Sequence, residues 1–163
     1  RSVGQLPCYY NPKSSYRPMR YCDQEENALY PFGYGLSYTT FFLEKTAHCA
    51  RISIEELRAG KRAEVTFRLK NTGKQDSYAV PQLFIRDLQA STVRRIRELK
   101  AFDKVFVKAG EEKICSLSLG EEELALWDAD MAFRVEPGDF SISLEEGGQV
   151  FFTGILTVYL KSH

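Results

Sequence analysis

The stretch Ala63-Glu64-Val65-Thr66-Phe67-Arg68-Leu69-Lys70 decides the fold class of this chain. Its apolar residues Val65, Phe67 and Leu69 alternate with polar ones, and this period of two places them on one face of a β-strand. Asn71-Thr72-Gly73-Lys74 follows as a turn, in which the glycine is free to adopt a positive φ. The stretch therefore predicts a strand with one buried face.

Similar segments recur along the rest of the chain. Ile52 and Ile54 alternate in one of them, whereas the segment around Pro81 is apolar on both phases, which predicts a strand covered on both faces and interrupted at the proline. Further strands are expected over 104–108, 113–119, 132–135, 140–144 and 150–159, in addition to 49–55 and 79–86. Roughly eight short strands separated by turns are typical of a β-sandwich.

Two short stretches between the predicted strands are expected to form a turn and a helix. Residues 109–112 (Ala-Gly-Glu-Glu) predict a hairpin turn between the strands on either side. Residues 120–126 form the only stretch that favours a helical turn, since its three leading acids suit the positive end of a helix dipole. Everything after residue 46 is therefore expected to be all-β with one short helix.

Overall composition excludes several classes of function. Lys plus Arg and Asp plus Glu are both 22, so the formal net charge is zero, which argues against nucleic-acid binding and against a basic membrane-surface segment. No apolar run approaches the ~20 residues that a membrane span requires. The chain begins with Arg1 and has no signal-like segment, so we interpret it as a piece of a longer protein.

The first part of the chain differs in composition from the remainder. Seven of the nine tyrosines and four of the six prolines precede residue 39, and this region has neither a helical nor a strand period. Rings at this density bury large areas when a partner surface is available. We therefore divide the chain into an irregular, aromatic-rich segment at 1–45 and a β-sandwich at 46–163.

The four cysteines, Cys8, Cys22, Cys49 and Cys115, form no CxxC pair and no Cys/His cluster, so we expect no structural metal. Cys115 alternates with Leu117 and Leu119 and would lie on the same face of a strand, which predicts a buried thiol. Scattered cysteines without a framework are usually reduced. This pattern, and the absence of an Asn-x-Ser/Thr sequon, favour the cytoplasm, although the pairing of the four thiols stays open.

Candidate catalytic groups are scarce. His48 lies in the expected linker and His163 is terminal, and a nucleophile needs a base within hydrogen-bond reach. The acids cluster in turns, where no pair stands out as suited to glycosidic cleavage. Residues 94–97 (Arg-Arg-Ile-Arg) are interpreted as a solvated loop or an interdomain salt-bridge patch, and Gly33-Tyr34-Gly35-Leu36-Ser37 as a tight turn between aromatic anchors. We therefore predict no catalytic residue and no cofactor.

Three stretches together resemble the C-terminal end of glycoside hydrolase family 3. Residues 1–11 are similar to the family motif that ends its α/β-sandwich domain, and residues 29–41 (LYPFGYGLSYTTF) are similar to its linking motif. A scattered third set resembles its fibronectin type III-like domain: Asn71-Thr72-Gly73, residues 82–87, Arg95 with residues 98–102, and residues 135–138. The sequence departs from the family pattern at Ile96, Ala101, Cys8, Cys22 and Cys115.

The resemblance implies a fibronectin type III-like (immunoglobulin-like) sandwich in a non-catalytic portion of a retaining β-glucosidase or β-xylosidase. The Ser-Asp-Trp nucleophile motif of the family is absent, because the only tryptophan, Trp127, follows Leu126. Partners would be the upstream catalytic domains, a β-linked oligosaccharide bound by the parent enzyme, and another copy of the enzyme in a homo-oligomer. Residues expected to pack between domains are Tyr30, Pro31, Phe32, Gly33, Tyr34, Gly35 and Tyr38. The alternative is a free-standing carbohydrate-binding or adhesion module that uses Tyr9, Tyr10, Tyr16 and Tyr21.

Overall fold

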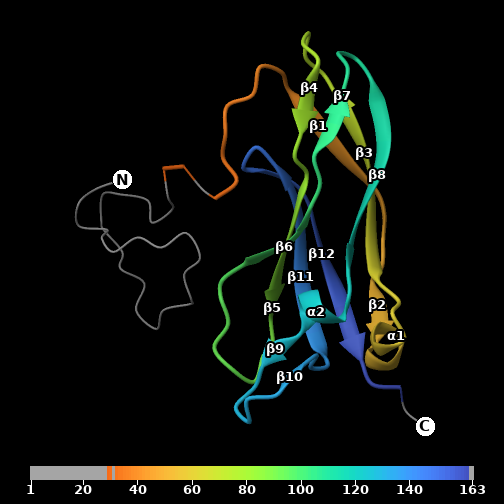
Figure 1. The fold of residues 1–163 in the computed structure, drawn as a ribbon, viewed down its shortest axis with the longest axis vertical. Helices are drawn as coiled ribbons and strands as arrows, with labels where there is room; N and C mark the ends of the chain where they lie inside the picture. The colour runs from red at the N-terminus through yellow and green to blue at the C-terminus, as the bar shows by residue number, and fades with distance from the viewer. Residues whose placement is uncertain (1–28, 31, 162–163) are drawn as a thin grey trace.

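The computed structural model describes residues 29–30 and 32–161, in which two β-sheets pack face to face (Figure 1). One sheet has three strands, in the order β1 (Phe41–His48), β3 (Ala63–Asn71) and β8 (Glu112–Leu119). The other has five, in the order β2 (Arg51–Ser53), β12 (Gln149–Tyr159), β11 (Gly138–Glu146), β5 (Gln82–Asp87) and β6 (Glu98–Phe102). Among these described strands, only β2 pairs in parallel, with β12. The predicted all-β sandwich is confirmed.

Smaller elements close the two ends of the sandwich. The short strands β4 (Ser77–Ala79) and β7 (Val105–Val107) pair at the upper end in Figure 1. The lower end carries the hairpin of β9 (Leu126–Trp127) and β10 (Phe133–Arg134), together with the helices α1 (Ile54–Arg58) and α2 (Glu121–Leu124). None of the helices in the described part of the chain is long and apolar enough to cross a membrane.

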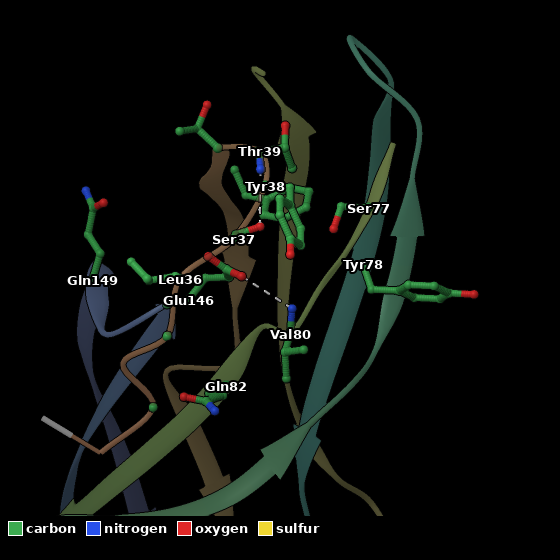
Figure 2. A pocket seen from close by; sticks show the side chains of 15 residues that line it. Leu36, Ser37, Tyr38, Thr39, Ser77, Tyr78, Val80, Gln82, Glu146 and Gln149 are labelled. Atoms are coloured by element: carbon green, nitrogen blue, oxygen red, sulfur yellow. Dashed lines mark hydrogen bonds between the residues drawn. The ribbon is translucent and has the colours of Figure 1, made fainter. Parts of the chain in front are cut away.

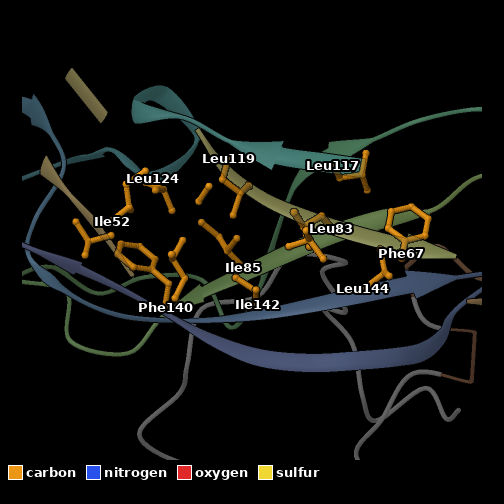
Figure 3. Close-up of a cluster of buried hydrophobic side chains, with 14 of the residues drawn as sticks. Ile52, Phe67, Leu83, Ile85, Leu117, Leu119, Leu124, Phe140, Ile142 and Leu144 are labelled. Carbon is orange, nitrogen blue, oxygen red and sulfur yellow. The ribbon is translucent and has the colours of Figure 1, made fainter. Parts of the chain in front are cut away.

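The core lies between the two sheets, where alternate residues of each strand point inward (Figure 3). On β3 the buried side chains include Val65, Phe67 and Leu69, as the alternation predicts. They face Ile142 and Leu144 of β11 and the corresponding residues of β5 and β12. Burial of this apolar surface drives the association of the sheets.

Strand β5 is covered on both faces, as its apolar character on both phases predicts. Leu83 and Ile85 point into the core, whereas Phe84 lies on the outer face of the sheet and is nevertheless only 2% exposed. Pro81 stands between β4 and β5, which belong to different sheets, so the missing N–H breaks no ladder. The outer face of β5 must therefore carry a covering segment.

The turn after β3 forms, but for a different reason from the one predicted. Gly73 does not have a positive φ. A Cβ added at Gly73 would lie 2.1 Å from Oγ1 of Thr39 and 3.0 Å from the backbone nitrogen of Thr40. Glycine is therefore required by the close approach of another segment and not by the backbone conformation of the turn.

A helix replaces part of one predicted strand. The strand expected over 49–55 ends at Ser53, and α1 follows at once. The hydroxyl of Ser53 accepts a hydrogen bond from the backbone N–H of Glu56 (3.2 Å), and the carboxylate of Glu56 accepts one from the backbone N–H of Ser53 (2.9 Å). This capping box starts a helix that the alternation of Ile52 and Ile54 hid. The turn predicted at 120–126 forms as α2.

The sandwich begins earlier than composition suggested. Strand β1 starts at Phe41 and pairs with β3, so the boundary predicted after residue 45 lies within β1. His48, expected in a linker, ends β1, and its ring centroid is 5.2 Å from that of Phe152. The turn at 109–112 also differs from the predicted hairpin, because β7 pairs with β4 whereas β8 pairs with β3.

Candidate interdomain contact site

The residues predicted to pack between domains lie in one segment that precedes β1. We call residues 32–40 the linking segment; it runs along the end of β5 and the turn between β11 and β12 (Figure 2). Tyr30, just before it, and the predicted residues within it are all described, whereas Pro31 lies outside the described residues. The contacts of this segment show which of its side chains pack on the sandwich and which are free to contact a second domain.

Phe32 is the point at which the linking segment attaches to the sandwich. Its ring meets the ring of Phe84 edge-on, with 6.0 Å between centroids. The guanidinium of Arg97 lies 4.3 Å from the centroid of the Phe84 ring and donates a hydrogen bond to the backbone oxygen of Phe32 (3.3 Å). Phe84 is therefore covered by Phe32 and Arg97, which explains its burial on an outer face.

Arg97 is itself held by a buried carboxylate. Its Nη1 lies 2.8 Å from Oε1 of Glu145, whose side chain is 2% exposed, and the hydroxyl of Ser143 donates to the same oxygen (2.9 Å). The basic run at 94–97 is thus only partly solvated: Arg95 and Ile96 are exposed, whereas Arg97 pairs with Glu145 and Arg94 pairs with Glu98 (2.8 Å). The sequence did not distinguish Glu145, since a glutamate on an outer strand face is ordinarily solvated, and it predicted the cover over β5 without naming the residues that provide it.

Two glycines permit the close approach of the linking segment to the sheet. Gly33 has φ +86°, and a Cβ there would lie 2.4 Å from Oε1 of Gln82. Gly148, in the β11–β12 turn, has φ +83°, and its Cβ would lie 3.1 Å from Cα of Tyr34. Gly35 differs, since no described atom lies within 4 Å of the position that a methyl group would occupy there. Glycine is therefore required at positions 33 and 148 by the positive φ, and at 148 also by the close backbone of Tyr34, whereas neither constraint acts at Gly35.

The other face of this region is exposed. Tyr30 and Tyr34 contact each other at 5.0 Å between centroids, yet 66% and 47% of their surfaces are accessible. Leu36 and Tyr38 are each 94% exposed. The structure thus brings Phe32 and Gly33 against the sandwich and leaves Leu36 and Tyr38 uncovered. Apolar surface of this kind marks a site of interaction.

A cavity of about 540 Å³ opens between the linking segment and the upper end of the five-stranded sheet (Figure 2). Glu146, at the end of β11, is the one charged residue among the described residues that line it. Oε1 of Glu146 accepts a long hydrogen bond from the backbone N–H of Val80 (3.5 Å), and burial raises the pKa of the carboxyl group. No sequence signal distinguishes Glu146 from the neighbouring acids.

The remaining candidate groups do not assemble into a reactive site in the described part of the chain. Cys49 and Cys115 are free thiols, and burial raises the pKa of Cys115, which lowers its reactivity. Cys8 and Cys22 lie outside the described residues. Within residues 29–30 and 32–161, no group of three His, Cys, Asp or Glu side chains could hold a metal ion. What these residues offer is a contact surface.

Known proteins resemble this chain over most of its length. Residues 79–147 match the fibronectin type III-like domain. A periplasmic β-glucosidase of Salmonella typhimurium is 36% identical over 87% of the chain, and a putative β-xylosidase of Formosa agariphila is 33% identical over 88%. A GH3 β-glucosidase of Bifidobacterium adolescentis superposes with a TM-score of 0.69 at 29% identity, covering 79% of this chain and 18% of its own. The chain belongs to glycoside hydrolase family 3.

Within family 3, the match is confined to the C-terminal, fibronectin type III-like part of the enzyme. The chain spans 19% and 18% of the two curated relatives named above. It also covers 23% of a Listeria innocua β-glucosidase solved with glucose, which superposes on 97% of this chain with a TM-score of 0.84 and 29% identity. The region matched is thus the non-catalytic, fibronectin type III-like portion of these enzymes, and it spans less than a quarter of the length of each relative named here.

Proposed function

We propose that this chain holds its sandwich against the preceding part of the same family 3 enzyme through the linking segment. The observation that carries the proposal is the difference between the two sides of that segment. Phe32 is fixed to the sandwich by Phe84 and Arg97, whereas Leu36 and Tyr38 are each 94% exposed. A second surface that covers these side chains would remove apolar area from water and fix the orientation of the two domains.

We further infer that the residues before β1, which begins at Phe41, complete the end of the preceding α/β-sandwich domain and form the linker that leads out of it. The parent enzyme would hydrolyse terminal β-D-glucosides or β-D-xylosides with retention of configuration. This proposal is supported by relatives named as β-glucosidase and β-xylosidase. A homo-oligomer of the parent enzyme is also a prediction, which light scattering on the full-length enzyme would check.

The contact is tested by comparing the same variants in the chain alone and in the full-length enzyme. Leu36→Ser and Tyr38→Ser remove exposed apolar area, so we expect no loss of stability in the chain alone. In the full-length enzyme each is expected to lower the thermal midpoint. Ile114→Ser is the matched control, since Ile114 is 65% exposed on the outer face of β8. Equal effects of all three variants in the full-length enzyme would contradict the proposal.

Catalysis is tested separately. Purified chain is expected to show no turnover of aryl β-glucosides or aryl β-xylosides, because the sequence singles out no pair of acids suited to glycosidic cleavage. Clear turnover that follows the chain through purification would contradict an accessory role.

The alternative function, a carbohydrate-binding module, is favoured by one observation. Trp127 and Phe133, paired across β9 and β10, have ring centroids 5.3 Å apart and are 59% and 49% exposed. The tyrosines first considered for this role, all before residue 22, lie outside the described residues. Because Trp127 is the only tryptophan, its fluorescence reports directly on binding of cello- or xylo-oligosaccharides. Saturable quenching that Phe133→Ala abolishes would support this function.

A further inference from the structure

The described lining of the cavity beside the linking segment contains one acidic side chain and no basic one. Its walls are residues 35–41 on one side and the ends of β4, β5 and β11 on the other (Figure 2). Among the described residues of the lining, Glu146 is the only charged one, and the other titratable groups are the phenols of Tyr38 and Tyr78. No lysine or arginine of residues 29–30 and 32–161 lines the cavity. The described lining therefore contains a negative charge and no positive one; the cation Lys104 contacts the ring of Tyr78, with its Nζ 4.6 Å from the ring centroid, and does not line the cavity.

Glu146 is poorly satisfied by the sandwich itself. The long hydrogen bond from Val80, at 3.5 Å, is its one contact with a donor among the described residues, and it forms no ion pair there. Its neighbour Glu145 differs, because Arg97 and Ser143 both contact it at less than 3 Å. A partly buried carboxylate is costly unless a cation or several donors offset the loss of water.

A second acceptor in the same lining also lacks a partner. Oε1 of Gln82 is buried and accepts no hydrogen bond in the described structure. It lies beside Gly33, so the acceptor is placed at the base of the linking segment. Gln82 thus contributes a buried, unpaired acceptor to the wall of the cavity, and Glu146 a carboxylate for which the described lining residues supply no charged donor. Buried acceptors in native proteins are nearly always paired, which points to a donor other than residues 29–30 and 32–161.

We propose that the cavity receives a lysine or arginine side chain from the preceding part of the same enzyme, which forms an ion pair with Glu146. The inference rests on the proposed function, because it gives the chemistry of the partner at that same contact. Sugar hydroxyls could donate to both acceptors, but they carry no charge to offset that of Glu146. We choose the preceding part of the enzyme as the source because residues 35–41, which form one wall of the cavity, follow it closely in the sequence.

The proposal predicts that Glu146→Gln has opposite effects in two contexts. In the chain alone, the substitution removes an uncompensated charge, so the thermal midpoint at pH 7 is expected to rise. In the full-length enzyme, it removes the ion pair and leaves the partner's cation unpaired, so the midpoint is expected to fall by about 2–4 °C. Glu64→Gln is the matched control, because Glu64 is exposed on β3 and should change neither midpoint.

A second measurement needs no variant. Carbon-13 titration of the Glu146 carboxyl is expected to give a pKa above 4.5 in the chain alone and below 4.5 in the full-length enzyme, because a cation stabilises the charged form. A pKa above 4.5 in both contexts, or a midpoint that changes in the same direction in both, would overturn the inference. The proposed function would still stand if Leu36→Ser and Tyr38→Ser destabilised only the full-length enzyme.

Discussion

Nη1 of Arg97 lies 2.8 Å from Oε1 of Glu145 on the outer face of the five-stranded sheet. Through this contact the loop before β6 is joined to β11, and the same guanidinium reaches the backbone oxygen of Phe32. The ion pair therefore couples the sandwich to the linking segment. Arg97 thus contacts both a buried residue of the sandwich and the segment that we propose joins the sandwich to the rest of the enzyme.

We predict that Arg97→Ala destabilises the chain by about 3 kcal/mol, because removal of one partner leaves a buried carboxylate without its cation. Urea unfolding followed by circular dichroism measures this loss. The control is Arg68→Ala, which removes an exposed pair with Glu44 and Glu112 and is expected to cost less than about 1 kcal/mol. Comparable losses in both variants would show that burial of Glu145 is not what makes Arg97 important.

Asn71→Ala is expected to cost about 3 kcal/mol, because removing the amide leaves buried groups without partners. Asn71 is fully buried, and its Oδ1 accepts a hydrogen bond from Oγ1 of Thr39 (2.6 Å). Its Nδ2 donates to the backbone oxygens of Gln75 and Val107 (2.8 and 3.1 Å).

Chemical denaturation of Asn71→Ala and Asn71→Asp checks this prediction. The aspartate keeps the acceptor for Thr39 but loses both donated hydrogen bonds, so it should also be destabilising. Thr72→Ala, at the exposed neighbour, is the control. Near-native stability of Asn71→Asp would mean that the two donated hydrogen bonds contribute little.

Gly33→Ala and Gly35→Ala form a matched pair in the linking segment. The first is expected to displace the segment from the sandwich, because φ is +86° and the new methyl group would overlap Gln82. The second meets no described atom within 4 Å and should be tolerated in the chain alone. Amide exchange of the linking segment, followed by NMR, should increase only in Gly33→Ala. Equal exchange in both variants would contradict the close packing at Gly33.

The capping box of α1 should make stability depend on acid pH. Hydrogen bonds from the backbone of Ser53 and from Lys61 lower the pKa of Glu56 from 4.5 to about 2. The folded chain then binds fewer protons than the unfolded chain between these values, so the stabilisation is complete above pH 4.5 and is lost as the pH falls through about 2.

Thermal melts across this pH range should therefore show a smaller acid loss in Glu56→Gln than in the native chain. Ser53→Ala should cost about 1 kcal/mol at neutral pH, because it removes the acceptor at the helix N-terminus. A native acid profile in Glu56→Gln would show that the capping carboxylate does not set this pH dependence.

Local patterns in the sequence predicted much of the sandwich. The alternation at 65, 67 and 69 identified β3, and the apolar run at 83–85 correctly indicated a strand covered on both faces. These patterns gave the wrong element where a side-chain hydrogen bond changed the backbone conformation. Ile52 and Ile54 alternate as in a strand, yet the hydrogen bonds of Ser53 and Glu56 start a helix between them. A capping box of two polar residues is easily hidden by apolar neighbours.

Strand alternation and motif order are properties of neighbouring residues, so they were enough to establish the fold class, the family and the position of the linking segment. Only the folded structure showed which side chains of that segment pack on the sandwich and which are left exposed for another domain. Phe32 packs on Phe84 and Tyr38 does not pack on the sandwich, although both are aromatic residues of one motif. The folded chain also separated Glu145 from Glu146, adjacent acids of which one has a cation and the other faces a cavity. These differences arise from contacts between strands distant in sequence, which no local pattern encodes.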